Sequence, residues 1–95
     1  MRRAPLAGAD LEDIWMHIAL DSVQAAETVV DQIYRAEMRL AEFPELGRKR
    51  DELRQGLRSW PIGSYLVFYR TEPGAVVILR ILHGARDLRS AFDGT

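Results

Sequence analysis

Several kinds of residue are missing from this sequence, and each absence excludes a class of protein. Its 95 residues contain no cysteine, which excludes disulfide bonds and thiolate metal sites. The two histidines, His17 and His83, are isolated from one another and do not predict a zinc site. We therefore expect no metal ion and no cofactor, and a chain without cysteine fits a reducing compartment.

Long hydrophobic runs are also missing. No apolar segment approaches the ~20 residues that a membrane-spanning helix needs, so we expect no membrane association. The first residues, MRRAPLAGADLEDIW, contain two arginines but lack the apolar core of about 7–15 residues found in a secretion signal. These absences predict a cytoplasmic protein.

The charges are present in ordinary number but are unevenly distributed. Hydrophobic residues make up 47% and charged residues 28% of the chain, which is typical of one globular domain, here residues 1–95. Residues 1–46 contain four arginines and nine acidic residues, whereas residues 47–95 contain nine basic and five acidic residues. The basic second half indicates either a solvated face or an anionic partner.

Apolar periodicity predicts two helices, at about residues 5–20 and 22–43. Pro5 suits the first turn of the first helix, and Asp21 and Ser22 supply side-chain oxygens that can cap the second. The second helix is apolar over a wide arc, because a main stripe is joined by a thinner one on a neighbouring face. The thinner stripe consists of Val23, Val30, Tyr34 and Met38. We interpret it as a contact with a sheet, with a partner-binding surface as the alternative.

Pro44 and Gly47 end the second helix, and the pattern changes to strands at about residues 57–61, 64–71 and 75–83. Pro73 and Gly74 predict a turn that pairs the last two strands in an antiparallel hairpin. The last strand is apolar on both sides, so we expect it to be central. Strict alternation places Val76, Ile78, Arg80 and Leu82 on one face, and Val77, Leu79 and Ile81 on the other.

This order of elements predicts an α+β fold in which a helical hairpin is packed on a small antiparallel sheet. The middle strand has bulky residues on both faces. We therefore expect an apolar concavity on the face away from the helices, available to another chain.

Three segments, within about residues 5–89, contain four recognisable motifs in order. The segments are ADLEDIWMHIA, AEFPELGRKRDELRQGLRSWPIGSYLVFYR and VVILRILHGARDL, and the motifs are DL..IW, FPELG, P.G.Y.VFYR and ILRILHGARD. With these motifs the chain resembles the RelE/ParE superfamily of toxins from type II toxin–antitoxin systems, and within it the ParE-like branch. One departure is at the start, where the family has a short strand and this chain has only Met1, Arg2 and Arg3 before Ala4-Pro5.

The first strand is therefore expected to be short or missing, or the true chain begins upstream of Met1. An uncovered strand edge recruits other strands. We expect a homodimer, or a hetero-oligomer with a partner that supplies the missing strand, and light scattering would detect either.

The resemblance implies two alternative activities for the terminal stretch RILHGARDLR. RelE-like members cut mRNA on the ribosome, which requires proton transfer and cations at the phosphate. ParE-like members inhibit DNA gyrase and cut nothing themselves. By motif, Arg86 and Arg58 match basic residues of the nuclease branch. Tyr65 stands about where that branch has an arginine, and Phe92 about where it has a C-terminal tyrosine.

Because two parts of the nuclease site are absent, we predict no enzyme activity and interpret the stretch as a docking surface for the target. The expected target-binding residues are Arg80, His83, Arg86 and Arg89. The runner-up is a ribosome-dependent ribonuclease using His83, Arg86 and Arg58. His83 otherwise caps the sheet by a hydrogen bond, and His17 is structural or solvated.

The resemblance also implies a cognate ParD-like antitoxin that keeps the toxin inactive. Spare apolar surface and the basic half suit an acidic, partly disordered antitoxin tail. The expected antitoxin-binding residues are Tyr34, Met38, Arg58, Trp60 and Tyr65. A non-toxic interaction module of the same fold remains an alternative. We expect no sequence-specific DNA binding by the chain alone, because acidic residues interrupt its arginines.

Overall fold

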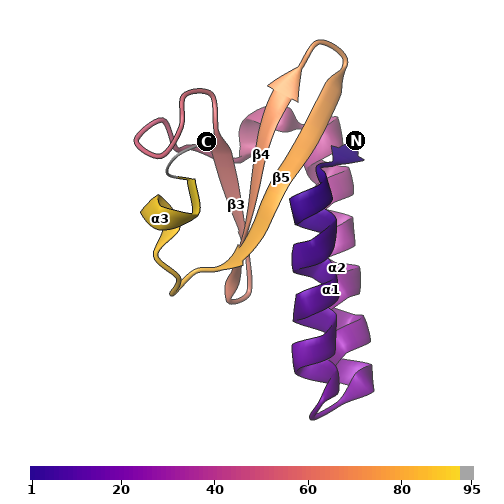
Figure 1. Cartoon of the computed structure of the whole chain (residues 1–95). Helices are drawn as coiled ribbons and strands as arrows, with labels where there is room; N and C mark the ends of the chain where they lie inside the picture. Colours follow the sequence, from indigo (N-terminus) through magenta and orange to yellow (C-terminus); the bar gives the residue numbers. More distant parts are fainter. Residues whose placement is uncertain (93–95) are drawn as a thin grey trace.

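The computed structural model describes residues 1–92 and confirms the α+β fold, with a helical hairpin packed against a sheet (Figure 1). In chain order its elements are β1 (Arg2–Arg3), α1 (Pro5–Ala19), α2 (Val23–Glu42), the 3₁₀ turn η1 (Pro44–Leu46), β2 (Arg48–Lys49), β3 (Arg58–Ile62), β4 (Tyr65–Glu72), β5 (Ala75–His83) and α3 (Leu88–Phe92).

Local signals account for the bounds of the two long helices. Pro5 occupies the first turn of α1, where its missing N–H costs nothing. Ser22 is the N-cap of α2, and its Oγ accepts a hydrogen bond from Ala25 N at 3.1 Å. The sequence made Asp21 an equal candidate for this cap, but Asp21 lies in the turn that precedes Ser22. At the other end, Pro44 begins η1 and prevents α2 from continuing.

The five strands lie in the order β1-β5-β4-β3-β2. The middle position belongs to β4, so the prediction that the last strand would be central is wrong by one place. β5 is nevertheless an interior strand, because β1 pairs with it in parallel at Arg2↔Val77 and Arg3↔Ile78. The first strand is therefore short and not missing, and part of the β5 edge is covered within the chain itself.

A register shift divides β5 and changes which residues face the helices. Phe68 of β4 lies opposite Arg80, but the next residue, Tyr69, lies opposite Ile78, which leaves Leu79 as an extra residue. Such a bulge reverses the alternation of the strand beyond it. Ile81 consequently packs with the helices, and the predicted assignment of faces is wrong from the bulge onward.

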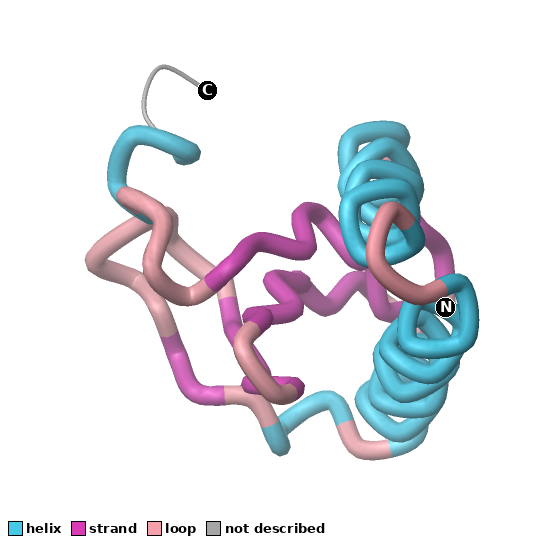
Figure 2. Tube along the Cα trace, turned by 90° about the horizontal axis from the view of Figure 1, so that it is seen from below, coloured by secondary structure: helices cyan, strands magenta, loops and turns pink. Residues whose placement is uncertain are grey.

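Each face of the sheet has its own hydrophobic cluster, and the second face is better covered than we expected. The cluster under the helices includes Ile33, Leu40, Val67 and Tyr69. On the other face, Phe68, Leu82, Leu57 and Phe92 pack together under the 50–57 loop and α3. Figure 2 shows the two long helices on one side of the sheet and α3 on the other. This short helix covers part of the predicted apolar concavity.

The thinner apolar stripe of α2 does not contact the sheet as we interpreted it. Val23, Tyr34 and Met38 are 55%, 49% and 49% exposed. Only Val30 packs against the core cluster under the helices. The alternative interpretation, a surface open to a partner, is therefore the one compatible with the structure.

Side chains hold the two-residue strand β1 in place. Arg3 donates to both carboxylate oxygens of Glu37 on α2, through Nε at 3.1 and 2.9 Å. Glu37 is completely buried, and this hydrogen bond raises the pKa of the Arg3 guanidinium. Arg2 contributes a more exposed pair with Glu72 at 3.2 Å. A strand of two residues forms few backbone hydrogen bonds, so these ion pairs contribute much of what holds β1 on the sheet.

Candidate functional site

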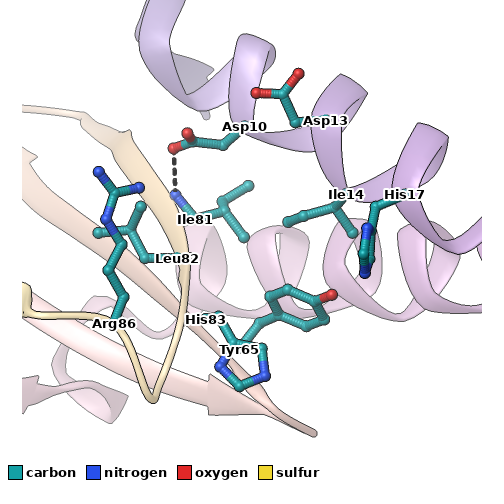
Figure 3. Close-up of a pocket in the computed structure, with 9 residues that line it drawn as sticks. All are labelled: Asp10, Asp13, Ile14, His17, Tyr65, Ile81, Leu82, His83 and Arg86. Carbon is teal, nitrogen blue, oxygen red and sulfur yellow. Dashed lines mark hydrogen bonds between the residues drawn. The ribbon is translucent and has the colours of Figure 1, made fainter.

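The terminal stretch RILHGARDLR borders a hollow between α1 and the ends of β4 and β5 (Figure 3). The hollow is open to solvent and has a volume of about 330 Å³. Its lining combines acidic residues from α1, two histidines, one tyrosine and one arginine. The lining residues are Asp10, Asp13, Ile14, His17, Tyr65, Ile81, Leu82, His83 and Arg86.

Asp10 occupies one side of the hollow and binds Arg80. Its carboxylate accepts hydrogen bonds from Arg80 Nε at 2.8 Å and Nη2 at 2.9 Å, and from the backbone N of Ile81 at 2.9 Å. Donation to the Asp10 carboxylate raises the pKa of the Arg80 guanidinium. Arg80 is only 16% exposed, so this pair removes it from the surface cations expected to bind a target. The sequence offered no local signal that Asp10 would bind Arg80, because the two residues are 70 positions apart in the chain.

His83 and Tyr65 lie on neighbouring strands, in register. Their rings meet edge to face with centroids 5.5 Å apart. Nδ1 of His83 accepts a hydrogen bond from Ala85 N at 3.1 Å, as expected for a histidine that closes the end of a strand. Arg86 follows in the loop and lines the same hollow, as Figure 3 shows. The structure therefore brings His83, Arg86 and Tyr65 together.

Arg58 lies elsewhere on the sheet. The residue of β3 at the level of His83 is Ile62, through the pairs Ile62↔Tyr65 and Tyr65↔His83. Arg58 lies four residues further along β3, which is about 13 Å at about 3.3 Å per residue. Its guanidinium donates to the carbonyl oxygen of Gly47 at 2.7 Å. The residues of the alternative nuclease site are thus not assembled in one place.

Phe92, which stands near the position of the nuclease tyrosine, is part of the core. Its ring is 5% exposed and meets the Phe68 ring at a centroid distance of 4.9 Å. The helix that carries it is capped by Asp87, which accepts from Ser90 Oγ at 2.8 Å and Ser90 N at 3.3 Å. These bonds lower the pKa of Asp87. Arg89 is exposed and donates to Glu52 O at 3.4 Å.

A second hollow lies between α2 and the end of β3 and has a volume of about 420 Å³. We call it the α2–β3 groove. Its lining includes the half-buried Trp60 and Ile62 and two exposed arginines of α2, Arg35 and Arg39. The lining residues are Gln32, Arg35, Ala36, Arg39, Trp60, Pro61, Ile62 and Gly63. β2 pairs with Arg58 and Ser59, and among residues 1–92 no strand pairs with the remainder of the β3 edge, which borders this groove.

The residues expected to bind an antitoxin fall on different surfaces. Trp60 is in the α2–β3 groove, and Tyr65 is in the hollow beside His83. Tyr34 lies on the opposite flank of α2, where the Arg3 guanidinium is 5.7 Å from the centre of its ring. Met38, one helical turn further on, shares that flank. A partner that contacts all of them must wrap around the molecule.

Comparison with known proteins assigns the chain to a family. The model of the family described as "ParE toxin of type II toxin-antitoxin system, parDE" matches residues 2–88. The chain belongs to the ParE toxin family. Toxin ParE3 of Caulobacter vibrioides is 37% identical over 89 residues, covering 93% of this chain and 88% of that protein. Toxin ParE1 of Mycobacterium tuberculosis is 38% identical over 88 residues, covering 90% and 89%.

The fold of this chain is also seen in a solved structure. The structure titled "Chromosomal ParDE TA system from P. aeruginosa" superposes with a TM-score of 0.74 at 24% identity, covering 86% of this chain and 91% of that chain. Among residues 1–92, no helix combines the length and apolar character needed to cross a membrane. Within the same residues, His, Asp and Glu side chains form no cluster of three suited to a metal ion.

Proposed function

We propose that this member of the ParE family is a toxin that inhibits DNA gyrase in the cytoplasm and is neutralised by a cognate antitoxin. The whole chain, residues 1–95, acts as one toxin domain. Family membership carries the toxin assignment. The choice of gyrase over mRNA rests on one observation, namely that Arg58 lies apart from His83 and Arg86, so the residues matched to a ribonuclease site are not all in one place.

Cleavage by a 2′-hydroxyl needs a proton acceptor, a proton donor and cations at the phosphate. Of the residues matched to the nuclease site, His83 and Arg86 line the terminal hollow, together with His17 and Tyr65, whereas Arg58 is about four strand residues away. Asp10 in the same hollow is already paired with Arg80, and the negative charge of Asp13 disfavours a phosphate there. Phe92 has no hydroxyl and is buried. These features favour a protein target over cleavage of RNA.

Induction of the chain alone in cells tests the proposal. Plasmid supercoiling and the integrity of a reporter mRNA are followed over the first minutes. We expect relaxed or broken plasmid with intact mRNA. Purified gyrase with the purified chain should show the same loss of supercoiling, which excludes an indirect effect.

The alternative ribonuclease predicts the opposite result. Cut mRNA with normal supercoiling, abolished by His83→Ala, would reject the gyrase proposal and assign proton transfer to His83. Normal growth with both molecules intact would identify a non-toxic module of the same fold.

For the antitoxin, we propose that the α2–β3 groove receives an apolar segment with acidic flanks. Trp60 and Ile62 supply apolar contact, while Arg35 and Arg39 attract carboxylates. Pro61 lies on the open edge of β3 and has no N–H to donate, which disfavours addition of a strand at this point. Side-chain packing is therefore the expected mode of contact in the groove.

Charge reversal at the groove rim should slow association with the antitoxin. Arg35→Glu combined with Arg39→Glu is expected to lower the association rate at least tenfold at low salt, with a smaller effect at high salt, because salt screens the attraction. Stopped-flow or surface-plasmon measurements against the cognate antitoxin would report the rate. Arg70→Glu, on the β4 strand, is the matched control. Equal rates for the wild type and the groove variant would contradict this docking mode.

A further inference from the structure

The turn between α1 and α2 exposes large apolar side chains. Met16 is 64% exposed, Leu20 is 85% exposed and Val23 is 55% exposed. Met16 lies in the last turn of α1 and Leu20, four residues on, is the C-cap of that helix, so the two are neighbours. Val23 begins α2 directly after the turn. Figure 1 shows this end of the hairpin projecting beyond the ends of the strands. We call these three residues the hairpin tip.

The segment that forms the hairpin is strongly acidic. Residues 4–34 contain six acidic residues and not one lysine or arginine, although the whole chain contains 13 basic residues. Among residues 1–92, two of the six are paired with an arginine. Asp10 binds Arg80, and Asp31 pairs with Arg35, which directly follows the segment. The exposed carboxylates nearest the tip include those of Asp21 and Glu27.

This combination restricts what can cover the tip. An acidic surface repels nucleic acid and anionic lipid, and it repels the same surface of a second copy of the chain. The exposed apolar side chains need an apolar hollow on the partner to be buried. A protein surface with such a hollow and a basic rim satisfies both requirements.

We propose that the hairpin tip docks the toxin on a basic protein surface of its target. This inference rests on the proposed function, because it identifies the target as a protein. It assigns target contact to the hairpin and leaves the α2–β3 groove to the antitoxin. Arg80 binds Asp10, so the terminal stretch presents fewer cations to a target than its sequence suggests.

The test is the double variant Met16→Ser with Leu20→Ser. Both side chains are largely exposed, so the change should leave the thermal midpoint nearly unaltered. Leu6→Ser is the matched control, because Leu6 is 60% exposed on the same helix but at its other end. Two readouts are compared, growth arrest after induction and inhibition of purified DNA gyrase. Co-purification with the antitoxin checks that each variant remains folded and bound in the groove.

We expect the tip variant to need at least tenfold more protein for half-inhibition of gyrase and to lose growth arrest, while Leu6→Ser behaves as the wild type. Raising the salt concentration should weaken inhibition by the wild type. Growth arrest that depends on the tip while wild-type protein leaves gyrase active would reject the gyrase proposal and retain the tip as the docking surface. Full toxicity of the tip variant, or a wild-type chain without toxicity, would overturn the inference.

Discussion

Replacing Arg3 with alanine is expected to lower the free energy of unfolding by about 3–5 kcal/mol, because it leaves a buried charge without its partner. The Glu37 side chain is completely buried, and Arg3 donates to both of its oxygens. The same change also releases β1 from α2. Chemical denaturation followed by tryptophan fluorescence would measure the loss.

Arg2→Ala is the control for this prediction. Its pair with Glu72 is exposed, so its loss should cost less than about 1 kcal/mol. A double variant, Arg3→Met with Glu37→Leu, removes both charges and should recover most of the stability, since a buried ion pair can be replaced by apolar side chains. Similar losses for Arg2→Ala and Arg3→Ala would mean that β1 contributes to stability without the buried pair.

Replacing Gly47 with alanine is expected to cost about 3 kcal/mol, through steric conflict with the buried Tyr69 side chain. A Cβ at this position would lie 2.6 Å from Tyr69 Cε1 and 2.7 Å from Cζ, and nearest of all to the hydroxyl oxygen. That hydroxyl accepts from Gly47 N at 2.8 Å and donates to Pro44 O at 2.6 Å. Burial raises the pKa of Tyr69, as expected for a phenol held in the core. Displacing the ring would disturb both bonds.

Gly8→Ala provides the contrast. Gly8 lies inside α1 with no heavy atom near the position of an added Cβ, so alanine should stabilise the protein by about 0.5–1 kcal/mol. Thermal unfolding of the two variants side by side would show shifts of opposite sign. A loss below about 1 kcal/mol for Gly47→Ala would show that the ring of Tyr69 can move aside at little cost.

Elements defined by neighbouring residues were predictable from the sequence. Pro5, Ser22 and Pro44 set the ends of the long helices through groups within a few residues of each. The Pro73-Gly74 turn likewise predicted the β4–β5 pair. The sequence alone therefore determined the helical hairpin, the antiparallel strands and the α+β class, because backbone hydrogen bonding and apolar periodicity are local.

Contacts between distant segments were decided only by the tertiary structure. A segment of two residues is too short to be predicted as a strand from its sequence. β1 forms because Arg3 binds Glu37 and because the segment pairs with β5. The bulge at Leu79 depends on how β4 and β5 pair, and it exchanges the faces of every later residue. α3 covers the second sheet face because the ring of Phe92 packs against the ring of Phe68, which is distant in the sequence.

The same division holds for the candidate site. The sequence identified His83 and Arg86 as chemically capable residues, strand register places Tyr65 beside His83, and Arg86 lines the same hollow. It could not show that Arg80 is bound by Asp10, because an arginine 70 residues from its carboxylate carries no local signal. Residue types limit the available chemistry, whereas strand pairing and helix packing decide which charges remain at the surface.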